Sequence, residues 1–143
     1  MKYYIAYGSN LNVSQMSMRC PDAKIYGVGE LKDYELLFKG QAFQSYLTIE
    51  PKDGSSVPVA IWEVSHKDEQ NLDFYEGYPL LYDKHTVKLD NGIEAFVYIM
   101  KDEASIEISV PSKLYFDTCM RGYEDFNFDV GVLKNAYCKY FFD

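Results

Sequence analysis

Short segments rich in aromatic and β-branched residues fill the first two thirds of this 143-residue chain, and they constrain its fold more than any other feature. Gly, Asp and Pro separate these segments, which is typical of strands that end in turns. We expect strands at Lys2–Ala6, Lys24–Leu31, Tyr34–Lys39, Ser45–Glu50, Val57–Val64, His85–Leu89 and Glu94–Met100. Asp90-Asn91-Gly92 predicts that the last two form an antiparallel hairpin, because Asn-Gly tolerates the positive φ angles of a primed turn.

Helical signals are fewer. We expect one helix after Asn12, one from His66 to about Tyr75 with Ser65 as N-cap, one from Ser112 to about Arg121 ending at Gly122, and one capped by Asp129. Many short strands and few helices predict one α+β domain over residues 1–143. Its mixed, strongly curved sheet would close into a small β-barrel with the helices at its periphery, while the strand pairing stays open.

Charge and hydropathy narrow the class of protein. A formal charge of −8 disfavours binding to phosphate backbones and anionic membranes. The longest apolar runs fall short of the roughly 20 residues that a membrane helix needs, and the run after Lys2 is too short for a signal-peptide core. We therefore expect a cytoplasmic protein with no nucleic-acid or membrane partner.

The chain lacks the usual signatures of metal or disulfide chemistry. Its three cysteines, Cys20, Cys119 and Cys138, are odd in number and never spaced as Cys-x-x-Cys. Neither His66 nor His85 sits in a ligand-spaced cluster with acids or cysteines. We expect no metal ion and no cofactor.

The tetrapeptide Tyr7-Gly8-Ser9-Asn10 is the first candidate site. If a strand ends at Tyr7, the N–H groups from Gly8 to Leu11 leave the sheet ladder and can converge on an anion. The chain has only two arginines, so an anionic ligand would depend largely on such N–H groups or on hydroxyls. An ordinary strand-to-helix turn capped by Asn10 or Asn12 explains the same residues, and both interpretations stay open.

Glu76 is the second candidate. Gly77 and Pro79 end a helix directly after it, which places its carboxylate at the negative end of the helix dipole. Four aromatic residues lie within a few positions, namely Phe74, Tyr75, Tyr78 and Tyr82. Burial against such rings would raise the pKa of Glu76 towards a value suited to proton transfer. Glu76 is therefore a candidate general acid/base, and a solvated Glu at a helix end is the alternative.

Five motifs, taken in order, resemble those of the γ-glutamylcyclotransferase family, and together they span most of the chain. They are Tyr7-Gly8-Ser9-Asn10-Leu11, Arg19-Cys20-Pro21-Asp22-Ala23, Leu72-Asp73-Phe74-Tyr75-Glu76-Gly77-Tyr78-Pro79 with Tyr82, Ala95-Phe96-Val97-Tyr98, and Pro111-Ser112-Lys113-Leu114-Tyr115 with Gly122-Tyr123.

The resemblance implies a small β-barrel with a substrate cavity at one end and enzymatic release of 5-oxoproline from a γ-glutamyl compound. It implies Glu76 as the catalytic carboxylate. The residues that it implies for substrate binding are Tyr7, Gly8, Ser9, Asn10, Leu11, Tyr82, Tyr98 and Tyr115. The expected partner is a small γ-glutamyl substrate, and a homodimer is left open.

Alternatives of three kinds remain. One is a relative that acts on a γ-glutamylamine or on a carrier-bound γ-glutamyl group. Ser9 after Gly8 resembles the γ-glutamyl-peptide branch more than the γ-glutamylamine branch, where Thr tends to follow the Gly. Another is a noncatalytic barrel that binds a small ligand, against which the presence of Glu76 argues. A metal enzyme is the least favoured of the three.

Overall fold

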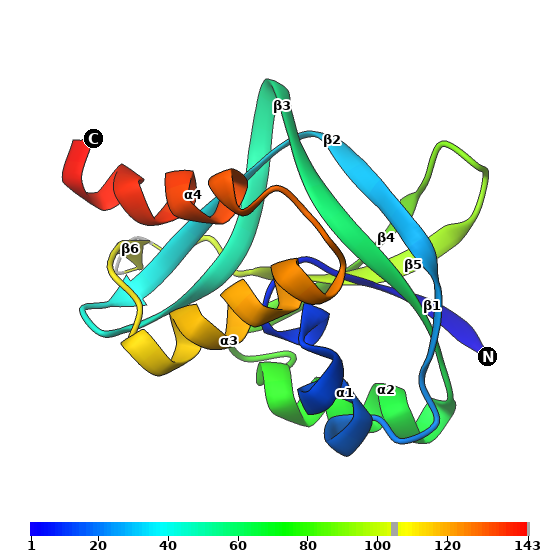
Figure 1. Ribbon diagram of the computed structural model, residues 1–143. Coiled ribbons are helices and arrows are strands. Elements are labelled where there is room, and N and C mark those ends of the chain that lie inside the picture. The colour runs from blue at the N-terminus through cyan, green and yellow to red at the C-terminus, as the bar shows by residue number, and fades with distance from the viewer. Residues whose placement is uncertain (104–105, 143) are drawn as a thin grey trace.

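The structure is a computed structural model that describes residues 1–103 and 106–142. These residues form a six-stranded sheet and four α-helices (Figure 1). The strands are β1 (Lys2–Ala6), β2 (Lys24–Gln41), β3 (Gln44–Val64), β4 (Tyr82–Lys88), β5 (Glu94–Met100) and β6 (Glu107–Ile108). The helices are α1 (Val13–Arg19), α2 (His66–Glu76), α3 (Lys113–Asp125) and α4 (Val130–Phe142), and a 3₁₀ turn, η1, spans Ser9–Leu11.

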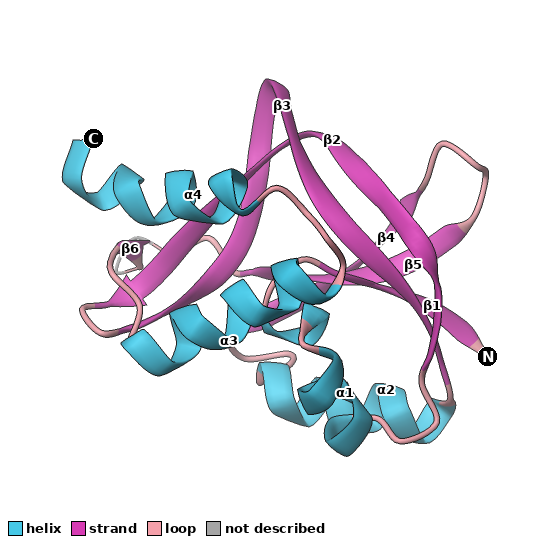
Figure 2. Cartoon of the chain, viewed as in Figure 1, coloured by secondary structure: helices cyan, strands magenta, loops and turns pink. Residues whose placement is uncertain are grey.

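The sheet is mixed and strongly curved, which confirms the predicted fold class. Its strand order is β4-β5-β1-β3-β2-β6. The inner strand β1 pairs antiparallel with β3 and parallel with β5, where Tyr4 faces Phe96. The sheet curls into a half-barrel because the long β2–β3 hairpin bends along its length (Figure 2).

The sequence predicts four short strands in this region, and this prediction is wrong, because the structure has two long ones. The predicted strands Lys24–Leu31 and Tyr34–Lys39 are both parts of β2, and Ser45–Glu50 and Val57–Val64 are both parts of β3. The turn-forming residues between them make a bulge. The register shifts between Lys32 and Tyr34, where Asp33 has a φ of 64° and accepts a hydrogen bond from the Gly54 N–H at 3.0 Å. These residues bend the hairpin without ending it.

The β4–β5 hairpin has the predicted antiparallel pairing, with Lys88 opposite Glu94. Its turn is not the predicted primed one, because Gly92 has a positive φ of 87° and Asn91 does not. In this turn the Gly92 N–H donates to the Leu89 carbonyl at 2.8 Å. Strand β4 starts at Tyr82, three residues before the predicted start at His85.

The helices begin where the sequence predicts. Asn12 caps α1 by accepting a hydrogen bond from the Gln15 N–H at 3.0 Å. Of the two predicted candidates, Asn10 and Asn12, the N-cap is therefore Asn12. Ser65 caps α2 in a capping box with Asp68. No helix in the described ranges is long and apolar enough to cross a membrane.

Helix α3 continues past its predicted end at Gly122 as far as Asp125. Gly122 therefore has a packing role and does not end the helix. A Cβ atom built at this position would lie 2.6 Å from the Leu11 Cβ and 2.7 Å from the Asn12 nitrogen. The missing side chain lets α3 press directly on the η1 turn.

We predict that Gly122→Ala lowers the free energy of unfolding by at least about 1 kcal/mol, because the clash with η1 outweighs the better helix propensity of Ala. Gly27→Ala is the matched control, since a Cβ there meets nothing within 4 Å. Urea unfolding followed by circular dichroism measures both. A Gly122→Ala protein as stable as the control would contradict this close packing.

Candidate active site

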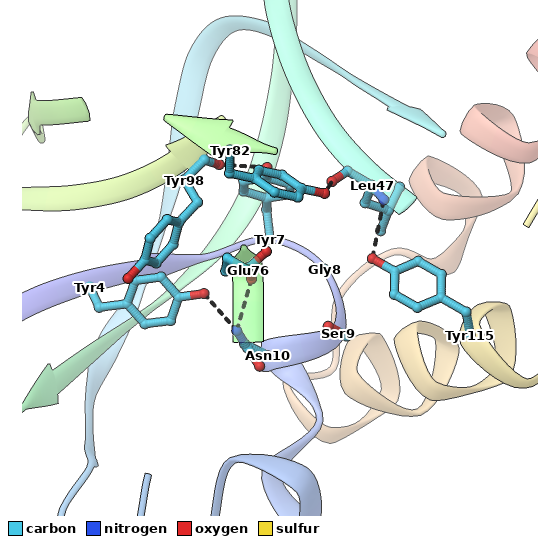
Figure 3. A pocket seen from close by; sticks show the side chains of 10 residues that line it. All are labelled: Tyr4, Tyr7, Gly8, Ser9, Asn10, Leu47, Glu76, Tyr82, Tyr98 and Tyr115. Atoms are coloured by element: carbon cyan, nitrogen blue, oxygen red, sulfur yellow. Dashed lines mark hydrogen bonds between the residues drawn. The ribbon is translucent and has the colours of Figure 1, made fainter. Parts of the chain in front are cut away.

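A small cavity opens where β1 runs into η1 (Figure 3). Its lining residues come from β1, the η1 loop, β3, the end of α2, β4, β5 and α3, and are Tyr4, Tyr7, Gly8, Ser9, Asn10, Leu47, Glu76, Tyr82, Tyr98 and Tyr115. All but one of the predicted site residues thus lie around one space. The exception is Leu11, whose fully buried side chain belongs to the core.

Glu76 is the last residue of α2, and Gly77 ends the helix in the left-handed conformation with a φ of 68°. The carboxylate projects into the cavity and is half-buried. Burial raises the pKa of Glu76 from its ordinary 4.5 to about 7, and the Arg19 guanidinium lowers it by a smaller amount. The pKa of Glu76 is thus raised, as the sequence predicts.

The side chains that surround Glu76 are only partly the predicted ones. Phe74 is 91% exposed and points away, and Tyr78 does not line the cavity. Helical geometry explains the miss for Phe74, because residues two apart lie on different faces of a helix. Of the four predicted aromatic residues, Tyr82 does line the cavity, and most of the remaining wall comes from tyrosines that are distant in sequence, on β5, on α3 and in or just after β1.

Asn10 holds the carboxylate. Its Nδ2 group donates to Glu76 Oε1 at 3.3 Å and to the Tyr4 hydroxyl at 2.8 Å. Its Oδ1 atom accepts a hydrogen bond from Arg19, whose guanidinium also stacks on the Tyr75 ring. Among the described residues, no hydrogen bond reaches the second oxygen of Glu76, so that oxygen is available to a ligand.

Tyrosine hydroxyls tie the cavity walls to the backbone. Tyr82 donates to the Leu47 carbonyl at 2.7 Å, and the Leu47 N–H donates to the Tyr115 hydroxyl at 3.1 Å. Tyr7 donates to the Tyr98 carbonyl at 2.7 Å. Burial raises the pKa of Tyr7, Tyr82 and Tyr115, so these groups stay neutral at physiological pH.

Tyr98 is fixed by a charged network behind the cavity. Its hydroxyl donates to Asp73 Oδ1 at 2.6 Å, and Lys84 pairs with the same oxygen at 2.7 Å. Lys84 also pairs with Glu69 at 2.8 Å. Asp73 therefore orients a cavity tyrosine.

The loop that leads into η1 lines the cavity and, in the described part of the chain, has unpaired backbone donors. The N–H groups of Leu11 and Asn12 close the 3₁₀ turn on the carbonyls of Gly8 and Ser9, each at 3.0 Å. The N–H groups of Gly8, Ser9 and Asn10 precede these bonds and have no partner among the described residues. A Cβ on Gly8 would approach the Leu47 side chain to 3.2 Å, so glycine keeps the loop close to the cavity wall.

Two lining residues have no distinguishing signal in the sequence. Tyr4 is one of several strand tyrosines, and Leu47 contributes mainly backbone groups, which any residue type supplies. Their roles follow only from the tertiary structure. Within residues 1–103 and 106–142, no group of three or more His, Cys, Asp or Glu side chains is placed to hold a metal ion.

Comparisons with known proteins identify the family. The profile of "Gamma-glutamyl cyclotransferase, AIG2-like" matches residues 4–116. The chain is 32% identical over 81 residues to a gamma-glutamylcyclotransferase of Bos taurus and, equally, to one of Homo sapiens. Each alignment covers 52% of this chain and 43% of the relative, less than half of its length.

Solved structures show the same fold. One that is named gamma-glutamyl cyclotransferase superposes with a TM-score of 0.80 at 24% identity, covering 94% of this chain and 85% of that one. The matched segment contains the η1 loop, Glu76 and the cavity tyrosines. This chain therefore belongs to the γ-glutamyl cyclotransferase, AIG2-like family.

Proposed function

We propose that this protein is a γ-glutamylcyclotransferase that releases 5-oxoproline and a free amine from a γ-glutamyl amino acid, peptide or amine. The observation that carries the proposal is the Glu76 carboxylate. It lines the cavity together with Gly8, Ser9 and Asn10 of the loop, and its pKa is raised to about 7. Such a group accepts and returns a proton near neutral pH.

The substrate supplies its own nucleophile. The α-amine of a γ-glutamyl amide reaches the γ-carbonyl carbon through a five-membered ring, so the enzyme needs no Ser–His or Cys–His pair. Well-oriented intramolecular attack gives effective molarities of roughly 10⁵–10⁸ M. A narrow cavity that holds the glutamyl chain folded would favour this geometry.

Glu76 would move the protons. The ionised carboxylate takes a proton from the substrate α-ammonium group, and the free amine then forms the new N–C bond at the γ-carbon. The bond from this carbon to the leaving nitrogen breaks as the protonated Glu76 gives its proton to that nitrogen. The regenerated carboxylate then takes the second proton, which the attacking nitrogen loses when it becomes the lactam N–H, and passes it to the released amine, which leaves as an ammonium ion. One carboxylate therefore serves as both base and acid.

The N–H groups of Gly8, Ser9 and Asn10 are suited to bind negative oxygen. They would hold either the substrate α-carboxylate or the developing γ-oxyanion, as backbone donors do in oxyanion holes. Arg19 is already engaged with Asn10, Gln15 and the Tyr75 ring. The reaction as written uses no metal or cofactor, and we place it in the cytoplasm, as the sequence suggests.

We predict that Glu76→Gln folds but forms 5-oxoproline at least about 10²-fold more slowly, since removal of a positioned acid/base typically costs 10²–10⁴ in rate. A panel of a γ-glutamyl amino acid, a γ-glutamyl dipeptide and a γ-glutamylamine provides the substrates. Glu124→Gln, which alters an exposed residue of α3, is the matched control. Turnover by folded Glu76→Gln equal to that of the control would remove Glu76 from this role.

The pH profile offers a second test. Below pH 7 Glu76 is largely protonated and cannot accept the ammonium proton, so kcat/KM should rise with pH and level off above an apparent pKa of about 7. The residual activity of Glu76→Gln should lack this step. A wild-type profile that stays flat between pH 5.5 and 8 would contradict the assignment.

The free energy of unfolding should fall as pH rises, whereas kcat/KM should increase. The two measurements therefore separate the effect of Glu76 on folding from its effect on catalysis. The pKa of Glu76 is raised in the folded protein, so its stabilising contribution is complete below about pH 4.5 and is lost as pH rises through 7. Relative to Glu76→Gln, the wild type should therefore lose unfolding free energy between pH 5 and 8, on the order of 2–3 kcal/mol.

A further inference from the structure

A second hollow adjoins the inner cavity. We call it the outer hollow, and its lining residues are Tyr46, Tyr75, Glu76, Leu81, Tyr82 and Tyr115. Glu76, Tyr82 and Tyr115 line both spaces. The acid/base carboxylate therefore stands at the junction of two compartments.

The two compartments differ in chemistry. The inner cavity is lined by Gly8, Ser9 and Asn10 of the loop, whereas the outer hollow is walled by aromatic rings and Leu81. Tyr82 donates its hydroxyl proton to the Leu47 carbonyl, Tyr115 accepts from the Leu47 N–H, and the Tyr75 hydroxyl is hydrogen-bonded to the Ser9 hydroxyl at 2.9 Å. These residues present mainly ring carbon to the hollow.

The fourth ring completes an aromatic wall. Tyr46 packs edge-to-face against Tyr115, with ring centroids 5.1 Å apart and an interplanar angle of 89°. Across the same hollow, Leu81 contributes aliphatic surface and is 36% exposed. An apolar group bound here would be removed from water on several sides.

We propose that the outer hollow binds the amine leaving group and selects an apolar body on it, aromatic or alkyl, without recognising a carboxylate there. This inference rests on the proposed function. If the glutamyl part occupies the inner cavity and its α-carboxylate or γ-oxygen meets the loop N–H groups, the scissile bond lies beside Glu76. The leaving group then extends into the outer hollow.

The residues that line the outer hollow include no cationic side chain that could pair with a carboxylate. Glu76 is the only charged side chain among the residues that line the outer hollow, and none of them is Lys, Arg or His. The nearby Arg19 guanidinium lies 3.4 Å from the Tyr75 ring centroid and is hydrogen-bonded to Asn10 and Gln15. A second negative charge on the substrate would gain no ion pair and would face Glu76.

The test compares three substrates that share the γ-glutamyl group, namely γ-glutamyl-methylamine, γ-glutamyl-phenethylamine and γ-glutamyl-phenylalanine. The two alkylamine leaving groups have similar basicity, so their chemical steps are comparable. We expect kcat/KM for the phenethylamine compound to exceed that for the methylamine compound by at least about tenfold, through burial of the phenyl ring. The phenylalanine compound should be no better than the phenethylamine compound.

Two adjacent leucines provide matched variants. Leu81→Ala should reduce the ratio of phenethylamine to methylamine kcat/KM by about threefold or more, because it removes part of the apolar wall. Leu80→Ala should leave the ratio unchanged, since Leu80 is 84% exposed and lines neither space. Circular dichroism checks that both variants are folded.

The outcomes separate this inference from the proposed function. If 5-oxoproline forms from all three compounds with a wild-type ratio near one, the outer hollow is not an apolar subsite, although the cyclotransferase function stands. If kcat/KM for the phenylalanine compound is tenfold higher than for the phenethylamine compound, the outer hollow recognises the carboxylate. This result would overturn the inference that it does not. If no compound yields 5-oxoproline, the proposed function fails, and this inference fails with it.

Discussion

The hydrogen bonds of Asn10 join four parts of the chain at one point. Its side chain contacts Tyr4 of β1, Glu76 of α2 and Arg19 of α1, and its carbonyl accepts the indole N–H of Trp62 in β3 at 3.2 Å. An apolar residue here would leave several buried groups unpaired, each at a cost of roughly 1–3 kcal/mol. The position of the carboxylate, the course of η1 and the docking of α1 thus depend on one side chain.

The cavity tyrosines form similar hydrogen bonds with backbone groups of the sheet. A small half-barrel exposes backbone groups wherever neighbouring strands diverge, and buried backbone groups need partners. Tyr82 and Tyr115 satisfy the two groups of Leu47, and Tyr7 satisfies the Tyr98 carbonyl. The residues that line the cavity therefore also stabilise the fold.

Local sequence signals predicted the helix starts, the antiparallel β4–β5 pair and the end of α2 at Glu76, because caps and turns act over a few residues. These signals failed where tertiary packing determines the local structure. Asp33 and Gly54 read as a loop but form a bulge in a continuous hairpin, and Gly122 reads as a helix end but serves close packing against η1. In the site, the motif order indicated Glu76 and most of the wall, whereas Tyr4 and Leu47 required the pairing of strands.

In the proposed reaction the substrate amine, and not water, attacks the γ-carbonyl beside Glu76. Mass spectrometry of the products formed from a γ-glutamyl substrate in ¹⁸O-labelled water distinguishes the two nucleophiles. Cyclisation forms the new bond to nitrogen, so we predict 5-oxoproline as the primary product, without solvent oxygen. Glutamate that carries ¹⁸O as the primary product would show attack by activated water and would contradict the mechanism, even if Glu76 proved essential.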